Sequence, residues 1–274
     1  MNKNALTRYI VCTVLIFFAF LLHKTAGYIL LFAFLIFTLY IERSIFYQVF
    51  ASRAYRKGDM DKAISWLEKA CRIAKSKPAV KILYGYLLLK KGKLEEAEKV
   101  FEELLNSGID NNSMLQAKSN YALVLWKKGK LKDAVKMLED VFSNYKNTTI
   151  YGSLGYLLIL DGDVNKALNF NKEAYEYNSS DAVILDNLGY TYYKIGNIKK
   201  AEEIYQKLIG LNPSFPEAYY NYSCVLKDLG RMEKALEMAT KAKSYKLSYL
   251  SNLKEQELDD HLKELNDLIS IKSK

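Results

Sequence analysis

The sequence predicts an all-α protein, an α-solenoid of about six helical hairpins that ends in a capping helix and is preceded by two transmembrane helices. Two observations lead to this prediction. A pattern of glycine, alanine and large apolar residues recurs about every 34 residues through most of the 274-residue chain, as expected for stacked hairpins. The first 41 residues instead contain two apolar runs without a polar face, which is typical of helices in lipid.

The first predicted element is a membrane-anchoring helical hairpin in residues 1–43. Residues 9–22 are uncharged and mostly apolar, and a second such run covers residues 26–41. The expected spans, about 5–22 and 26–41, would be about 27 and 24 Å long, against a hydrocarbon core of about 30 Å. Local thinning of the bilayer, with Arg8 and Lys24 reaching the interface, would close this gap. A re-entrant hairpin is the alternative.

A cleaved signal peptide and a buried soluble hairpin are two rival interpretations of this region. Lys3 and Arg8 before an apolar run resemble a signal peptide. Against it, Lys24 lies close before the small residues 25–27 where cleavage would occur, and a second apolar run follows at once. A soluble helix would need a polar face, which neither run has. The sequence therefore favours two membrane helices.

The placement of positive charge predicts the orientation of the hairpin. Residues 1–57 contain seven Lys or Arg and one acid, Glu42, which makes +6 of the formal net charge of +9. Only Lys24 of these cations lies in the turn between the two runs, so the positive-inside rule places both termini and the solenoid in the cytoplasm. We expect a two-span cell-membrane protein whose basic cluster contacts anionic lipid headgroups. Abundant Lys, Ile, Asn and Tyr hint at a bacterium of low GC content.

No linker separates the membrane hairpin from the solenoid. Neither glycine nor proline occurs between Gly27 and Gly58, and the second apolar run passes through Glu42 directly into an apolar stretch that begins at Ile45. Glycine and proline are the usual signals that end a helix. We therefore expect one continuous helix across this junction, or at most a small kink.

The solenoid is predicted from a turn glycine and the residues at fixed distances from it. The glycine recurs at spacings of 34, 37, 33, 34 and 34 residues, at Gly58, Gly92, Gly129, Gly162, Gly196 and Gly230. Five residues after each glycine comes an alanine. Seven residues before each comes a small residue: Ala51, Gly85, Ala122, Gly155, Gly189 or Ser223. Apolar residues three or four apart on both sides of the glycine predict two amphipathic helices, A and then B.

This period and residue pattern resemble the tetratricopeptide repeat (TPR) family. The resemblance covers about residues 44–247 in six copies, 44–77, 78–114, 115–147, 148–181, 182–215 and 216–247. It implies a right-handed solenoid in which the small residues lie where helices A and B cross. Only the fifth copy retains its closing proline, Pro213, and the fourth has Asn171 at a usually apolar position, where we expect looser packing.

Residues 248–274 are predicted to form a capping helix and tail. After Lys243 the repeat pattern stops, and Leu258, Leu262, Leu265 and Ile269 form one apolar stripe with acidic residues on the other faces. Such a helix covers the last hairpin of a solenoid with a soluble outer surface.

The resemblance implies that a partner peptide binds in the concave groove lined by the A helices. The predicted groove residues are Asn120, Trp126, Lys127, Tyr156, Asn187, Tyr190, Tyr193, Lys194 and Asn221. The three asparagines occupy equivalent positions and could donate to and accept from a peptide backbone, or could instead satisfy local hydrogen bonds. An aromatic floor with a basic edge suits an extended segment that is acidic or ends in a carboxylate. The full two-carboxylate clamp of chaperone-binding members is not evident.

The sequence contains no visible catalytic constellation. The two histidines, His23 and His261, lie in the membrane turn and in the cap, and the three cysteines have no ligand spacing. We therefore expect no enzyme activity, metal or cofactor. Residues after 57 carry about +3, which argues against a nucleic-acid partner.

The predicted function is a membrane-anchored scaffold or adaptor that binds a protein or peptide partner in the concave groove. The alternative is an assembly or regulatory factor of an envelope process, whose transmembrane hairpin contacts a membrane partner. Because function belongs to sites on a fold rather than to the fold, the sequence leaves the partner, the process and the oligomeric state open.

Overall fold

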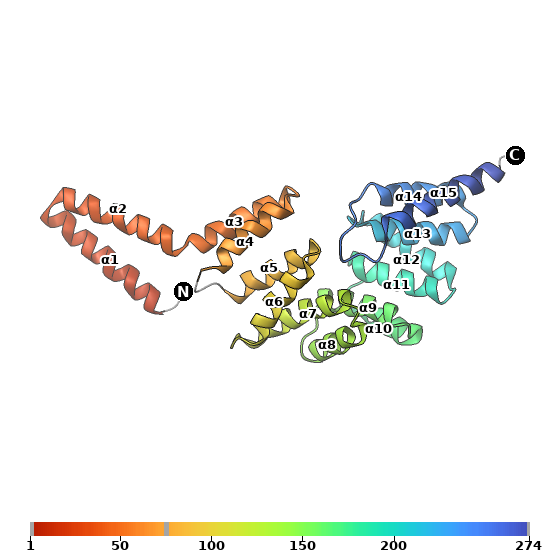
Figure 1. The fold of residues 1–274 in the computed structure, drawn as a ribbon, viewed down its shortest axis with the longest axis horizontal. Helices are drawn as coiled ribbons and strands as arrows, with labels where there is room; N and C mark the ends of the chain where they lie inside the picture. Colours follow the sequence, from red (N-terminus) through yellow and green to blue (C-terminus); the bar gives the residue numbers. More distant parts are fainter. Residues whose placement is uncertain (1–2, 74–76, 273–274) are drawn as a thin grey trace. The chain divides into compact units, whose positions relative to one another are not determined.

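The computed structural model describes residues 3–73 and 77–272, and every regular element in these ranges is a helix (Figure 1). The chain divides into two compact units, Met1–Lys81 and Ile82–Lys274. Unit 1 contains α1 (Lys3–Leu22), α2 (Lys24–Ile41), α3 (Arg43–Arg56) and α4 (Met60–Cys71). Helix α5 (Pro78–Lys90) begins in unit 1 and continues into unit 2.

Unit 2 continues with helical pairs and ends in one further helix. The helices that follow α5 are α6 (Leu94–Leu105), α7 (Asn111–Lys127), α8 (Leu131–Asn144), α9 (Thr148–Asp161), α10 (Val164–Tyr177), α11 (Ala182–Lys194), α12 (Ile198–Gly210), α13 (Pro216–Asp228), α14 (Met232–Lys243) and α15 (Glu255–Lys272). Successive pairs pack on each other through α6 and α7, α8 and α9, α10 and α11, and α12 and α13. This is the solenoid that the repeated pattern predicts.

The turn within each hairpin depends on its glycine. All six turn glycines have positive φ, from +74° at Gly230 to +94° at Gly162. This left-handed conformation suits glycine because it has no Cβ to clash with the following carbonyl. In the fifth hairpin, the N–H of Asn197 donates to the Tyr192 carbonyl across the turn at 2.9 Å, which closes α11 in a Schellman motif. The Asn197 side chain then accepts from the N–H of Lys200 and caps α12.

Small residues on helix A match large residues on helix B. A Cβ added at Gly85 would lie 2.8 Å from the Phe101 ring, and one added at Gly189 would lie 2.9 Å from the Tyr205 ring. Both rings are fully buried. Glycine therefore leaves the volume that an aromatic ring fills, and the close-packed core has no space for both side chains.

Asn171 packs tightly, so the expectation of looser packing in the fourth hairpin is wrong. Its side chain is fully buried, and a Cβ added at Gly155 would lie 2.1 Å from its Oδ1. Its amide donates to the Thr191 hydroxyl at 3.1 Å and to the Gly155 carbonyl at 3.4 Å. A polar contact thus replaces the aromatic contact seen at Gly85 and Gly189, because asparagine and glycine together fill the crossing.

The N-terminal hairpin has its apolar side chains on the outside. Helix α1 packs on α2, where the Phe20 ring lies against Gly27 and meets the Tyr28 ring edge to face at 5.1 Å. Phe18 and Phe32, by contrast, are 56% and 67% exposed. Among the described helices, α2 is long and apolar enough to cross a membrane, with a mean hydropathy of 1.8, and residues 10–22 of α1 form a shorter apolar stretch.

The junction between α2 and α3 is interrupted at one residue, so the chain does not form the continuous helix that was one of the two expected forms. Glu42 leaves helical geometry with φ −86° and ψ 9°, and its carbonyl accepts from the N–H of Ile45 in a tight turn. Figure 1 shows that the chain changes direction at this point. A single residue forms the whole connection, because α2 ends at Ile41 and α3 begins at Arg43.

Candidate functional site

The first helices of neighbouring hairpins in unit 2 form one face. Helix α11 contacts both α9 and α13, which are the equivalent helices on either side of it. The residues predicted to bind a partner lie on α7, α9, α11 and α13. Some of them lie under another part of the chain and are called the covered group, and others line an open cleft and are called the open group. The amides of the three asparagines bond within the protein.

The covered group consists of Trp126, Lys127 and Tyr156. The Trp126 and Tyr156 rings meet edge to face with centroids 5.6 Å apart, and the Lys127 ammonium lies 4.1 Å from the Trp126 centroid. The non-helical residues 244–254 between α14 and α15, here called the C-terminal segment, reach this group. The Lys127 ammonium donates to the Ser251 carbonyl at 3.0 Å. The chain's own backbone therefore occupies this part of the face.

Further contacts hold the C-terminal segment against the covered group. The Tyr249 ring would lie 3.1 Å from a Cβ added at Gly92, and its centroid is 5.4 Å from the Lys127 ammonium. Burial lowers the pKa of Lys127, although the carboxylate of Glu217 opposes the shift. Burial also raises the pKa of Tyr156, next to the Asn252 backbone. A partly dehydrated cation and a buried phenol therefore face a peptide backbone.

The open group consists of Tyr190, Tyr193 and Asn221, which line a cleft of about 650 Å³ between α11, α13 and α15. The other lining residues are Tyr220, Cys224, Lys227, Lys254, Gln256, Glu257, Asp260, His261 and Glu264. Lys194 is exposed, and its ammonium lies 5.8 Å from the Tyr190 centroid. Burial raises the pKa values of Tyr190 and Tyr193, so both remain neutral hydrogen-bonding groups near pH 7.

Polar contacts connect α13 and α15, two of the helices that line the cleft. The Tyr220 hydroxyl donates to Glu257 at 3.0 Å, and the Lys227 ammonium bonds both oxygens of Glu264 at 2.9 and 3.0 Å. The Lys227 hydrogen bonds lower the pKa of Glu264, so this carboxyl remains charged. These contacts join α13 to α15 and set the width of the cleft.

His261 on α15 makes a buried hydrogen bond to Ser223 on α13. The Ser223 hydroxyl donates to the Ala235 carbonyl at 2.7 Å, so the His261 Nε2, at 2.9 Å from that hydroxyl, acts as donor. Burial and the Lys227 charge lower the pKa of His261, which favours the neutral imidazole. Next to it, burial raises the pKa of the Cys224 thiol to about 11, which makes it a poor nucleophile.

The asparagines do not form a ladder for a peptide. Asn187 is 2% exposed, and its amide donates to the Gly152 carbonyl of the preceding hairpin at 2.8 Å, so the expectation of a groove contact is wrong for this residue. Asn120 donates to the Gln116 carbonyl of its own helix at 2.9 Å. Asn221 lines the cleft but donates to Asp186 at 3.1 Å. The alternative, that these amides satisfy local hydrogen bonds, describes all three.

Asp186 is a buried carboxyl beneath the open group. The Tyr205 hydroxyl and the Asn221 amide both donate to its Oδ1, each at 3.1 Å. Burial raises the pKa of Asp186 to about 7, and the nearby Glu217 adds to the shift while the two hydrogen bonds oppose it. The carboxyl can therefore change its charge near neutral pH under the floor of the cleft.

Sequence reasoning missed the contribution of the C-terminus to this face. It identified α15 as a cap but did not include Lys227, Glu257, His261 or Glu264 among the site residues, nor the segment that covers Lys127. One available signal was the row of acidic residues along the exposed side of residues 255–267. Among the described residues, no group of three or more His, Cys, Asp or Glu side chains could hold a metal ion.

Two regions of the chain match family models described as tetratricopeptide repeat, at residues 54–119 and at residues 182–215 and 216–249. The chain is a tetratricopeptide-repeat protein. This TPR protein also resembles a thermophilic TPR protein of Thermus thermophilus, with a TM-score of 0.56 and 19% identity, over 69% of this chain and 99% of that one. For pilF of Pseudomonas aeruginosa the TM-score is 0.56 at 14% identity, over 74% and 91% of the two chains. Identities this low show the fold alone.

Curated relatives match only parts of this TPR protein. The protein ycf37 of Pyropia yezoensis is 33% identical over 70 residues, which are 26% of this chain and 39% of that protein. A TPR repeat-containing protein of Methanocaldococcus jannaschii is 23% identical over 207 residues, 73% of this chain and 30% of that protein. The TPR protein thus spans well under half the length of these relatives. Repeats of this kind provide extended concave surfaces for binding protein or peptide partners.

Proposed function

We propose that this TPR protein is a membrane-anchored scaffold, which holds an extended segment of a protein partner on the face formed by α7, α9, α11 and α13. The observation that most supports this proposal is the bond from Lys127 to the Ser251 carbonyl. A face that already holds one stretch of backbone has a donor and aromatic rings that can bind another. The open cleft beside Tyr190 and Tyr193 then provides the free entry point.

The membrane part of the proposal rests on the exposed apolar surface of unit 1. Large apolar side chains stay exposed along α1 and α2 and continue onto α3, where Ile45 and Val49 are 52% and 55% exposed. A soluble protein rarely exposes such a continuous apolar surface, whereas lipid would cover it. Arg43, Arg53 and Arg56 on α3 would meet the headgroups, which supports a position of the first repeat at the cytoplasmic face.

Photo-crosslinking in cells tests the proposed partner site. A photoreactive residue at Tyr190 or Lys194 should trap a discrete protein, to be identified by mass spectrometry. The matched controls are probes at Lys172 on α10 and Lys234 on α14, which are exposed on second helices of their hairpins. If capture occurs from the control positions and not from Tyr190 or Lys194, the groove is not the binding surface.

Exchange of the N-terminal hairpin separates anchoring from a specific membrane contact. Replacing residues 5–41 with an unrelated transmembrane hairpin should leave partner capture from Tyr190 unchanged, because we assign the hairpin an anchoring role only. Deleting residues 1–41 should release the protein from the membrane fraction. If the exchange abolishes function while capture and anchoring persist, the hairpin itself contacts a membrane partner, as in an assembly or regulatory factor.

A further inference from the structure

We propose that residues 246–252 of the C-terminal segment are a resident ligand of the groove, which the partner's peptide must displace. This inference rests on the proposed function and specifies the partner. The peptide that replaces the segment has no acidic residue. It carries an aromatic side chain two residues before the backbone carbonyl that Lys127 binds. Tyr249 and Ser251 set this spacing in the chain itself.

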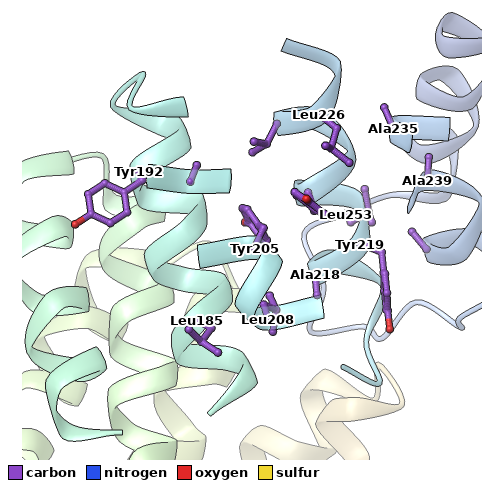
Figure 2. Close-up of a cluster of buried hydrophobic side chains, with 14 of the residues drawn as sticks. Leu185, Tyr192, Tyr205, Leu208, Ala218, Tyr219, Leu226, Ala235, Ala239 and Leu253 are labelled. Carbon is purple, nitrogen blue, oxygen red and sulfur yellow. The ribbon is translucent and has the colours of Figure 1, made fainter. Parts of the chain in front are cut away.

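The two ends of the C-terminal segment are packed into the core, whereas its middle is not. At one end the Tyr245 ring stacks on the Tyr219 ring, with centroids 5.5 Å apart and an interplanar angle of 11°. At the other end Leu253 is 9% exposed within the hydrophobic cluster that includes Leu185, Tyr205 and Leu226 (Figure 2). These two residues belong to the core of the last hairpins, so they hold the segment over the groove.

The middle of the segment is bound by few and replaceable contacts. Tyr249 is 40% exposed although its ring lies against Gly92, and the Lys127 hydrogen bond reaches the backbone of Ser251, not its side chain. The Ser251 hydroxyl accepts from the N–H of Leu253 at 3.0 Å, which is a contact within the segment. Any peptide that places a backbone carbonyl at the Lys127 ammonium and an aromatic ring against Gly92 can reproduce what the groove receives from the middle of the segment.

Charge favours this class of peptide over an acidic one. The segment contains Lys246 and Lys254 and no acidic residue. The face that the segment approaches contains the carboxyls of Glu217 and Asp186, which both raise the pKa of Tyr156. Glu257 and Glu264 line the neighbouring cleft. An acidic peptide would be repelled by these groups, whereas an uncharged or basic one would not.

Tethering determines how strongly the segment competes. Because both ends of residues 246–252 are anchored, their effective concentration at the groove is on the order of 1 mM. If the segment itself has an intrinsic Kd for the groove of about 100 µM, a competing peptide would bind the intact protein about tenfold more weakly than a groove without the segment. Partner binding would thus be suppressed until a stronger peptide or a second contact in the open cleft favours it.

The test uses the full chain in detergent and a fluorescent synthetic peptide of residues 246–252. In the linker variant, these seven residues are replaced by glycine and serine at the same length, while Tyr245, Leu253 and α15 stay. We expect the linker variant to bind the peptide at least about tenfold more tightly than the wild type by fluorescence anisotropy. Adding Lys127→Met, or a peptide with alanine in place of its tyrosine, should remove that gain.

Two results would overturn the inference. One is equal peptide affinity for the wild type and the linker variant. The other is a linker variant that keeps the thermal unfolding midpoint of the wild type and binds no peptide. If the linker variant does not fold, hydrogen exchange on the wild type decides: saturating peptide should speed exchange in residues 246–252, and unchanged exchange contradicts displacement. Crosslinking from Tyr190 does not depend on whether the C-terminal segment leaves the covered group. The proposed function can therefore hold while this inference fails, and this inference can hold while the proposed function fails.

Discussion

Equivalent positions in neighbouring hairpins of unit 2 have different surroundings. Trp126 and Tyr156, on α7 and α9, are covered by the C-terminal segment through Lys127 and Asn252. Tyr190 and Tyr193, on α11, line an open cleft instead. The residue types hardly differ, so the path of the chain after α14 causes the difference. In a solenoid, the cap can therefore determine which part of a concave face a partner can reach.

The largest expected effect comes from loosening α15, one of the helices that line the cleft. Leu265 on α15 is fully buried, so Leu265→Ala should cost about 2–5 kcal/mol of the stability of the C-terminal end and release α15. Limited proteolysis should then cut between residues 244 and 254. The exposed Lys263→Ala on the same helix should change stability by no more than about 0.5 kcal/mol. Equal protection in both variants would mean that α15 does not hold the segment.

The second prediction concerns the charge of Asp186, which lies beneath the open group. Asp186 has a pKa of about 7 in the folded protein and an unfolded value near 3.8, so the native state binds more protons between these values and its stability falls as pH rises through them. Asp186→Asn cannot ionise. The unfolding free energy of this variant relative to the wild type should therefore rise by up to about 4 kcal/mol from pH 4 to pH 8. Urea unfolding at several pH values measures it.

Taking the difference between variant and wild type removes the contribution of other groups. His261 acts in the opposite direction, because its lowered pKa makes stability fall as pH drops through about 6.5, the unfolded value of histidine. This contribution is common to both proteins and cancels. A difference that does not change with pH would show that Asp186 ionises freely in the folded protein.

The third prediction separates two asparagines at equivalent positions. Asn187→Ala should cost about 1–3 kcal/mol, because it removes the donor to the buried Gly152 carbonyl between hairpins, and should not change partner capture beyond the loss of stability. Asn221→Ala alters the cleft lining and leaves Asp186 with one donor fewer, so capture from a probe at Lys194 should fall. Chemical unfolding and crosslinking yield the two readouts. Equal loss of capture would remove the distinction.

The smallest effect is expected at Lys194. Its side chain is exposed above the Tyr190 ring, and exposed charges far from a core rarely change stability by more than about 0.5 kcal/mol. Lys194→Ala should therefore leave the unfolding midpoint unchanged and weaken partner capture from Tyr190. An unchanged capture would mean that the partner enters the cleft from the side of α15.

The hairpins were predictable from sequence because their determinants are local. A turn glycine with positive φ, a capping residue such as Asn197 and the pairing of Gly189 with Tyr205 all lie within one repeat. The accessible part of the groove was not predictable in this way. Lys127 and Ser251 are 124 residues apart, and no periodic pattern connects them. Asn187 was misassigned because its residue type suits both a peptide contact and the buried bond that it makes.

The position of the break at Glu42 was also not predicted, for a different reason. No glycine or proline marks it, and the interruption consists of one residue in a tight turn. The residues around it are as compatible with a continuous helix as with a bend.

One comparison of crosslinking positions tests the central claim most directly. Photoreactive residues are placed at Tyr190 and at Trp126, each in the wild type and in the linker variant of residues 246–252. We predict that Tyr190 captures the partner in both proteins, whereas Trp126 captures it only in the linker variant. Capture from Trp126 with equal yield in both proteins would contradict the claim that the C-terminal segment covers half of the groove.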